Sequence, residues 1–129
     1  MDSFNNLYRE EILEHYRSPL NFGKLKKYST TSRQLNPLCG DEIEIFIQWD
    51  KRGKGDSGDK SVVEISFEGK GCAISIASAS ILTDFAKGKT KKELTNFSEE
   101  DMLSLLGVHV SETRKKCALL ARSVLRDCL

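Results

Sequence analysis

The chain has 129 residues, of which 39% are hydrophobic and 30% charged, and its formal net charge is only +1. This length suits a single compact domain over residues 1–129, and the balanced composition argues against wholesale disorder and against a nucleic-acid partner. No stretch approaches the roughly 18 apolar residues of a membrane span, and the N-terminus lacks the pattern of a secretion signal, so we expect a cytoplasmic protein without a membrane partner.

The first predicted elements are a helix and a short strand. Apolar residues recur at helical spacing from Ser3 to Arg17, and Pro19 provides a stop just beyond them. We therefore expect an amphipathic helix over this stretch. The Thr/Ser-rich residues 28–34 are consistent with a short edge strand that leads to Cys39.

A β-hairpin is predicted next. Apolar residues alternate with polar ones, as in a strand with one buried face, at Ile43, Ile45, Ile47 and Trp49. Phe46 falls on the nominally polar side. Residues 63–67 alternate in the same way, and the charged, glycine-containing segment 50–60 is predicted to be a long polar loop between the strands. The Gly-Lys-Gly sequence at 69–71 is expected to end the second strand.

Three helices are predicted after the hairpin. Residues 72–87 are rich in Ala, Ile, Ser and Leu without a helix breaker, which indicates a mostly buried helix with Cys72 at its start. Ser98 begins a capping segment for a short helix that ends at Gly107. The last helix is expected to begin near Ser111, with an apolar stripe along one side.

Three of the four cysteines stand in settings that favour a thiolate, which is the form that binds metals and attacks sulfur. Cys39 lies in a predicted tight loop two residues before Asp41, whose carboxylate could share an ion with it. Cys72 opens a helix, where free N–H groups and the helix dipole stabilise an anion. Cys117 follows three consecutive basic residues, whose charges act in the same direction.

The spacing of the cysteines leaves their role open. Cys72 follows Cys39 by 33 residues and Cys117 follows Cys72 by 45, so the Cys-x-x-Cys pairs of closed zinc sites are absent. Three thiolates with a replaceable carboxylate suit zinc, copper(I) or an iron–sulfur cluster. Equally, Cys72 and Cys117 could be small buried hydrophobes. Cys128 lies roughly 16 Å beyond Cys117 if both are helical, and is predicted to pack in the core or in a frayed terminus.

Other polar residues give weaker signals. His15 and His109 are far from the cysteines in sequence and are predicted to be structural or solvated. The basic run 87–92 lacks interleaved aromatic residues, which indicates a solvated helix end. A docking surface for an acidic protein is the alternative interpretation of this run.

Three segments form an ordered set of cysteine motifs. They are Asn-Pro-Leu-Cys-Gly-Asp at 36–41, the stretch 69–80 that begins Gly-Lys-Gly-Cys-Ala-Ile-Ser, and Lys116-Cys117. This set resembles the motifs of iron–sulfur cluster assembly scaffolds, the IscU/SufU/NifU N-terminal family. The similarity also includes residues 7–9, 15–19 and 87–89, so it extends over nearly the whole chain.

The resemblance implies a compact α+β fold, with a three-stranded antiparallel sheet packed with about four to five helices. It implies that a [2Fe–2S] cluster or iron, or zinc in the isolated or SufU-type protein, is held by Cys39, Asp41, Cys72 and Cys117. Cys39 and Cys117 are then candidate acceptors of persulfide sulfur from a cysteine desulfurase, a transfer that needs thiolate character. The other implied partners are an electron donor and the carrier or client apoproteins that receive the cluster.

Two features relate the chain to different subgroups of this family. Lys116 precedes the third cysteine, where IscU-type members usually carry histidine, and a lysine there resembles the SufU type. The 45-residue separation of Cys72 and Cys117 resembles IscU, because SufU-type members usually carry a longer insert. Two hypotheses therefore stand: a non-enzymatic scaffold that builds a transferable [2Fe–2S] cluster, and a zinc-bound sulfurtransferase that stimulates a desulfurase. A structural zinc domain that only docks partners is a third.

Residues 107–112 precede the last predicted helix. They lack the Leu-Pro-Pro-Val-Lys segment by which the classical Isc scaffold is recognised by its chaperone. We therefore do not expect the dedicated Hsp70-type chaperone to be a partner.

Overall fold

The computed structural model describes residues 3–37, 40–54 and 59–129. In chain order the elements are α1 (Ser3–Arg17), β1 (Thr30–Asn36), β2 (Asp41–Lys54), β3 (Asp59–Lys70), α2 (Ala73–Ala86), α3 (Lys91–Thr95), α4 (Glu99–Leu106) and α5 (Glu112–Asp127). The predicted α+β class, with one three-stranded antiparallel sheet and four to five helices, is confirmed. Over the described ranges, each helix is too short or too polar to cross a membrane.

The sheet has the strand order β1-β2-β3, and both pairings are antiparallel. The β2–β3 hairpin is longer than predicted, because the pairing continues as far as Lys54 opposite Asp59. Most of the predicted 50–60 loop is therefore strand, and residues 55–58 lie outside the described part. At the other end β3 includes Gly69 and Lys70, so the predicted break falls at Gly71.

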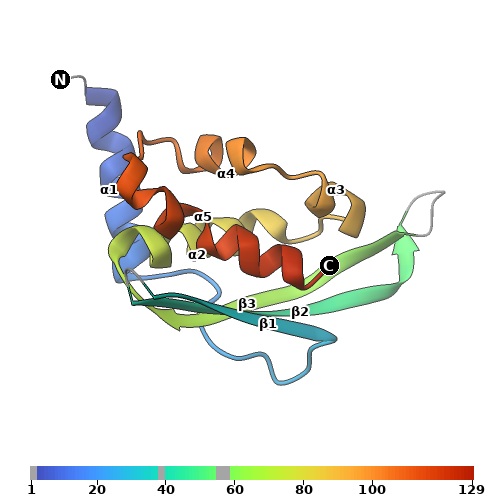
Figure 1. Ribbon diagram of the computed structural model, residues 1–129. Helices are drawn as coiled ribbons and strands as arrows, with labels where there is room; N and C mark the ends of the chain where they lie inside the picture. The colour runs from blue at the N-terminus through green and yellow to red at the C-terminus, as the bar shows by residue number, and fades with distance from the viewer. Residues whose placement is uncertain (1–2, 38–39, 55–58) are drawn as a thin grey trace.

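The hydrophobic core lies between one face of the sheet and the helices, which gather on that side in Figure 1. The side chains predicted to point inward from β2 are all buried, namely Ile43, Ile45, Ile47 and Trp49. They share the core with Leu82 of α2 and Val124 of α5. Each fully buried aliphatic side chain contributes about 1.5–3 kcal/mol to folding, so this strand anchors the helical layer.

The opposite face of the sheet is crossed by the segment between α1 and β1, as Figure 1 shows. Gly23 N–H donates to the carbonyl of Phe67 over 2.8 Å, which ties this segment to the free edge of β3. Further along, the Tyr28 ring lies edge-on to Phe46 with 5.1 Å between centroids. Phe46 is consequently buried despite its place on the polar face, a contact that strand periodicity did not predict.

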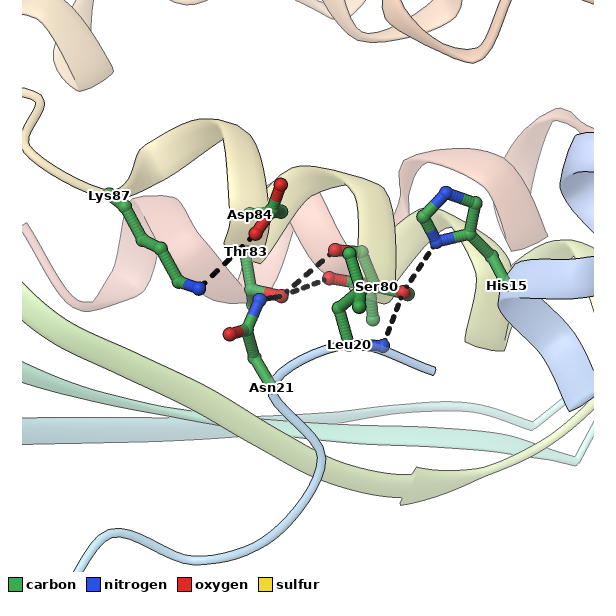
Figure 2. A network of polar contacts seen from close by, with 8 residues as sticks. His15, Leu20, Asn21, Ser80, Thr83, Asp84 and Lys87 are labelled. Atoms are coloured by element: carbon green, nitrogen blue, oxygen red, sulfur yellow. Dashed lines mark hydrogen bonds and ion pairs between the residues drawn. The ribbon is translucent and has the colours of Figure 1, made fainter. Parts of the chain in front are cut away.

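A polar network joins α1 and the chain that follows it to α2 (Figure 2). His15 Nδ1 lies 2.7 Å from Ser80 Oγ, and the backbone N–H of Leu20 donates to the same oxygen over 2.8 Å. Asn21 Nδ2 donates to Thr83 Oγ1 over 3.2 Å. These contacts give His15 the structural role predicted for it, because its ring connects two helices rather than facing the cysteines.

Helix α3 was not predicted, and it begins within the basic run 87–92. Its N-terminus carries a capping box, in which the Thr90 hydroxyl accepts from Glu93 N–H and the Glu93 carboxylate accepts from Thr90 N–H, each over 3.1 Å. The Thr-x-x-Glu pattern is a known helix start, so the signal was present in the sequence. Lys91 and Lys92 lie in this helix and are exposed.

Candidate metal centre

Three elements bring two thiols and a carboxylate together at one end of the sheet. Asp41 is the first residue of β2, Cys72 is the N-cap residue of α2, and Cys117 lies in the second turn of α5. Their ligand atoms all lie within 4.8 Å of one another. Because Glu42 of β2 pairs with Lys70 of β3, the residues just beyond that pair, Asp41 and Cys72, meet at the same end.

The donor set fits a soft metal. In a tetrahedral site with bonds of about 2.3 Å the donor atoms are roughly 3.8 Å apart, so a 4.8 Å spread needs only a small contraction. Asp41 and Cys117 are 0% and 1% exposed, while Cys72 is half-buried. Two sulfur atoms beside one carboxylate suit zinc or iron–sulfur chemistry rather than calcium or magnesium, which prefer oxygen ligands.

Asp41 is held as a carboxylate by hydrogen bonds to both of its oxygens. The backbone N–H of Cys72 donates to Oδ1 over 2.9 Å, and the Ser75 hydroxyl donates to Oδ2 over 2.6 Å. Burial alone would raise the pKa of Asp41, but these bonds, the Cys117 side chain and the charge of Arg114 together lower it below its ordinary value. The group is therefore ionised and available as a ligand near neutral pH.

The pKa of the Cys72 thiol is lowered below its ordinary value, which favours the thiolate. Burial raises the pKa of this thiol and so does the charge of Asp41, but hydrogen bonding with the backbone and side chain of Ser75 and with the side chain of Cys117 outweighs both effects, so the net pKa is lowered. A cysteine at the N-terminus of a helix commonly behaves in this way. The sequence-based expectation of an activated thiol at this position is supported by its local geometry.

Gly71 lies directly against the carboxylate of Asp41. A Cβ atom at this position would be 2.3 Å from Asp41 Oδ1 and 2.9 Å from Cγ. The backbone φ of Gly71 is +155°, a value that other residues rarely adopt. The glycine of the Gly-Lys-Gly-Cys motif therefore makes room for the carboxylate beside the cysteine that follows it.

Two predicted site residues are not among the three that form this cluster. Cys39 lies outside the described residues; the described residues Asn36 and Asp41 on either side of it pair with each other between β1 and β2. Lys116 is exposed and lines a shallow surface depression together with Leu35 and Glu99. The ligand role of Cys39, and the persulfide-acceptor roles of Cys39 and Cys117, stay predictions.

Cys128 packs in the core, as predicted. It is buried near the end of α5, with its Sγ atom 3.9 Å from the carbonyl oxygen of Ile45. Burial and the neighbouring charge of Asp127 raise the pKa of its thiol to about 12. This cysteine is therefore an inert thiol at neutral pH, and it does not belong to the cluster of donor atoms found among the described residues.

Ser75 is the polar residue at this centre that sequence reasoning missed. It was included only as one of several small residues in a buried helix, and its partner Asp41 is 34 residues away in the chain. The available signal was its position three residues after the N-cap cysteine, where a side chain turns back toward the helix start.

Comparison with known proteins agrees with this geometry. Residues 7–129 match the family model described as the NifU-like N terminal domain. The chain is 30% identical over 123 residues to the iron–sulfur cluster assembly scaffold protein IscU 1 of Archaeoglobus fulgidus. This alignment covers 95% of this chain and 74% of that protein. It is also 35% identical over 136 residues to the zinc-dependent sulfurtransferase SufU of Bacillus subtilis, and this alignment covers 92% of this chain and 86% of that protein.

Among solved structures, a candidate iron–sulfur cluster assembly scaffold of the SUF system from Fervidobacterium islandicum has a TM-score of 0.72 and 28% identity to this chain. That match covers 92% of this chain and 93% of the other. The cysteine motifs, the sheet with its helical layer and the match over residues 7–129 agree with one another, and the chain belongs to the family of NifU-like N-terminal domains.

Proposed function

We propose that this protein is a scaffold on which a [2Fe–2S] cluster is assembled from iron and desulfurase-derived sulfur and then passed to other proteins. The observation that carries the proposal is the convergence of Asp41, Cys72 and Cys117 within 4.8 Å at one end of the sheet. Cys39, two residues before Asp41, completes the proposed ligand set. The family relationship and the scaffold relatives support the same assignment.

The residues of this centre divide the work of holding and releasing the cargo. Thiolates are soft ligands that suit iron–sulfur clusters, whereas the carboxylate of Asp41 is harder and more easily replaced. Asp41 also adds a negative charge next to Cys72 and Cys117. A cluster bound here would therefore be held by sulfur and would have one position that an incoming ligand can displace.

Sulfur delivery needs a thiolate that a desulfurase can reach. Cys117 is 1% exposed, so of the two candidate acceptors we favour Cys39 as the first. Its thiolate would attack the outer sulfur of the desulfurase persulfide, forming one S–S bond as the other breaks, and the desulfurase would leave as a thiolate. Cytoplasmic location, the electron donor and the carrier or client proteins remain predictions.

The spacing of the cysteines favours the scaffold over the sulfur relay. Cys117 follows Cys72 by 45 residues, whereas SufU-type members of the family usually carry a longer insert between these two cysteines.

Anaerobic reconstitution tests the proposal. With iron, L-cysteine, a cysteine desulfurase and a reductant, the protein is expected to develop the visible absorption of a [2Fe–2S] cluster. Asp41→Ala is expected to lengthen the lifetime of that cluster several-fold in the presence of an iron chelator, because the most exchangeable ligand and one negative charge are removed. The measurement is the decay of the visible absorbance.

Glu68→Ala is the matched control, because it also removes one carboxylate but from an exposed position on β3. Its cluster should decay at the rate of the parent protein. A chain that forms no cluster under any reducing condition contradicts the scaffold proposal. Equal lengthening in both variants would show that overall charge, rather than Asp41, sets the lifetime.

A zinc-bound sulfurtransferase is the second candidate function, favoured by Lys116 and by the 35% identity to SufU. It predicts one equivalent of zinc in the purified protein and a marked stimulation of desulfurase turnover. Cys39→Ser should remove that stimulation, whereas Cys128→Ser, at an inert buried thiol, should keep it. Desulfurase turnover that is indifferent to the parent protein would count against this function.

A further inference from the structure

The hydroxyl of Ser75 touches all three residues of the described metal centre. Ser75 Oγ donates to Asp41 Oδ2 over 2.6 Å and lies 3.4 Å from the carbonyl oxygen of Cys117. Cys72 Sγ is 3.7 Å from Ser75 Oγ. Ser75 is itself buried in the first turn of α2. A residue that supplies no thiol and no carboxylate thus contacts the carboxylate of Asp41, the thiol of Cys72 and the backbone of Cys117.

The bond to Asp41 is the strongest of these contacts by geometry. A serine hydroxyl has one proton, and the short distance to Oδ2 assigns it to the carboxylate rather than to the more distant Cys117 carbonyl. Asp41 has no exposed surface, so water cannot easily replace this bond. Loss of one partner of a buried hydrogen bond leaves the other unsatisfied, which is generally unfavourable.

The two hydrogen bonds to Asp41 fix the plane of its carboxylate. Oδ1 is held by the N–H of Cys72 and Oδ2 by the hydroxyl of Ser75, so the group cannot rotate about its Cβ–Cγ bond without breaking one of them. Each oxygen keeps a further lone pair for a metal. In other metalloproteins, hydrogen-bond donors to a ligating carboxylate fix its orientation in the same way. Loss of such a donor typically costs 10- to 100-fold in metal affinity.

We propose that Ser75 is a positioning residue that holds Asp41 in the orientation in which it binds a metal. This inference rests on the proposed function, because it takes Asp41, Cys72 and Cys117 as the metal-binding group. It adds a residue that is neither thiol nor carboxylate to the determinants of affinity at this centre. Ser78, one turn further along α2, provides the comparison: it is fully buried, and its hydroxyl has no partner among the described residues.

The test is Co²⁺ binding to the metal-free protein, followed by the visible absorption of thiolate-bound cobalt. Ser75→Ala is expected to weaken binding by about 10- to 100-fold and to change the cobalt spectrum, while Ser78→Ala should bind like the parent. The isosteric pair Ser75→Thr and Ser75→Val repeats the comparison, because the two differ mainly in the hydroxyl. The Ser75→Thr variant should bind Co²⁺ more tightly than the Ser75→Val variant. This comparison tests the role of the hydroxyl even if Ser75→Ala does not fold.

A double-mutant cycle separates positioning from a structural role in joining α2 to α5. If Ser75 acts through Asp41, Ser75→Ala should have almost no effect on Co²⁺ affinity when introduced into Asp41→Ala. An equal loss in both backgrounds, or no loss in either, overturns the proposal. Co²⁺ binding needs no sulfide, iron or desulfurase, so failure of cluster assembly would contradict the proposed function alone.

Discussion

Cys117→Ser is expected to prevent cluster assembly and to weaken zinc binding by roughly 100-fold. A four-ligand zinc site in a small domain binds its ion with about 10–16 kcal/mol, so the share of one ligand is roughly 3 kcal/mol, and each 1.4 kcal/mol corresponds to about tenfold in affinity. A serine hydroxyl has nearly the shape of the thiol but is a poor ligand for soft metals. Zinc affinity is measured by competition with a chromophoric chelator.

Cys128→Ser is the matched control for this variant. Both cysteines are buried at α5, 11 residues apart, but the Sγ atom of Cys128 lies near the Ile45 carbonyl and its pKa is about 12. Removal of this thiol should leave zinc stoichiometry and affinity unchanged. If Cys117→Ser bound zinc like the parent, or if Cys128→Ser lost as much affinity, the assignment of Cys117 to the metal centre would be wrong.

Much of the fold could be predicted because its elements have strong local patterns. The period of two in β2 predicted which side chains face the helices, and the helical spacing from Ser3 to Arg17 matches α1 residue for residue. Helix α3 was missed although its capping box is a local signal, whereas another error arose where a distant segment decides the structure. Phe46 is buried because Tyr28 lies over it, and no local pattern near Phe46 indicates that contact.

The candidate site could be predicted only in part from residue types. Separations of 33 and 45 residues between cysteines say nothing about distance in space, and it was the family motifs that joined them. The structure brings Asp41, Cys72 and Cys117 together through the β2–β3 pairing and the packing of α5 against α2. The position of Ser75, three residues after the N-cap cysteine, was a local signal, but it does not identify the partner of the hydroxyl, because Asp41 is 34 residues away in the chain.

Gly71 shows how closely the backbone is fitted to this centre, and Gly71→Ala is expected to disrupt it. The new Cβ would stand 2.3 Å from Asp41 Oδ1. The carboxylate cannot move aside without losing its bonds to Cys72 N–H and Ser75 Oγ. An alanine at this φ also adds backbone strain of about 1–3 kcal/mol, so we expect the variant to unfold at lower urea concentration. We also expect a loss of at least tenfold in Co²⁺ affinity, roughly the effect of removing a hydrogen-bond donor to a metal ligand.

Gly88→Ala separates backbone strain from the contact with Asp41. Gly88 follows the other end of α2 with a φ of +77°, and a Cβ atom there would have no neighbour within 4 Å. This variant should be destabilised by about 1–2 kcal/mol through its left-handed backbone alone, with Co²⁺ affinity unchanged. Equal Co²⁺ affinity in the two folded variants would mean that the space beside Asp41 is not needed for metal binding. A selective loss in Gly71→Ala would instead tie the glycine of the Gly-Lys-Gly-Cys motif to the orientation of the carboxylate.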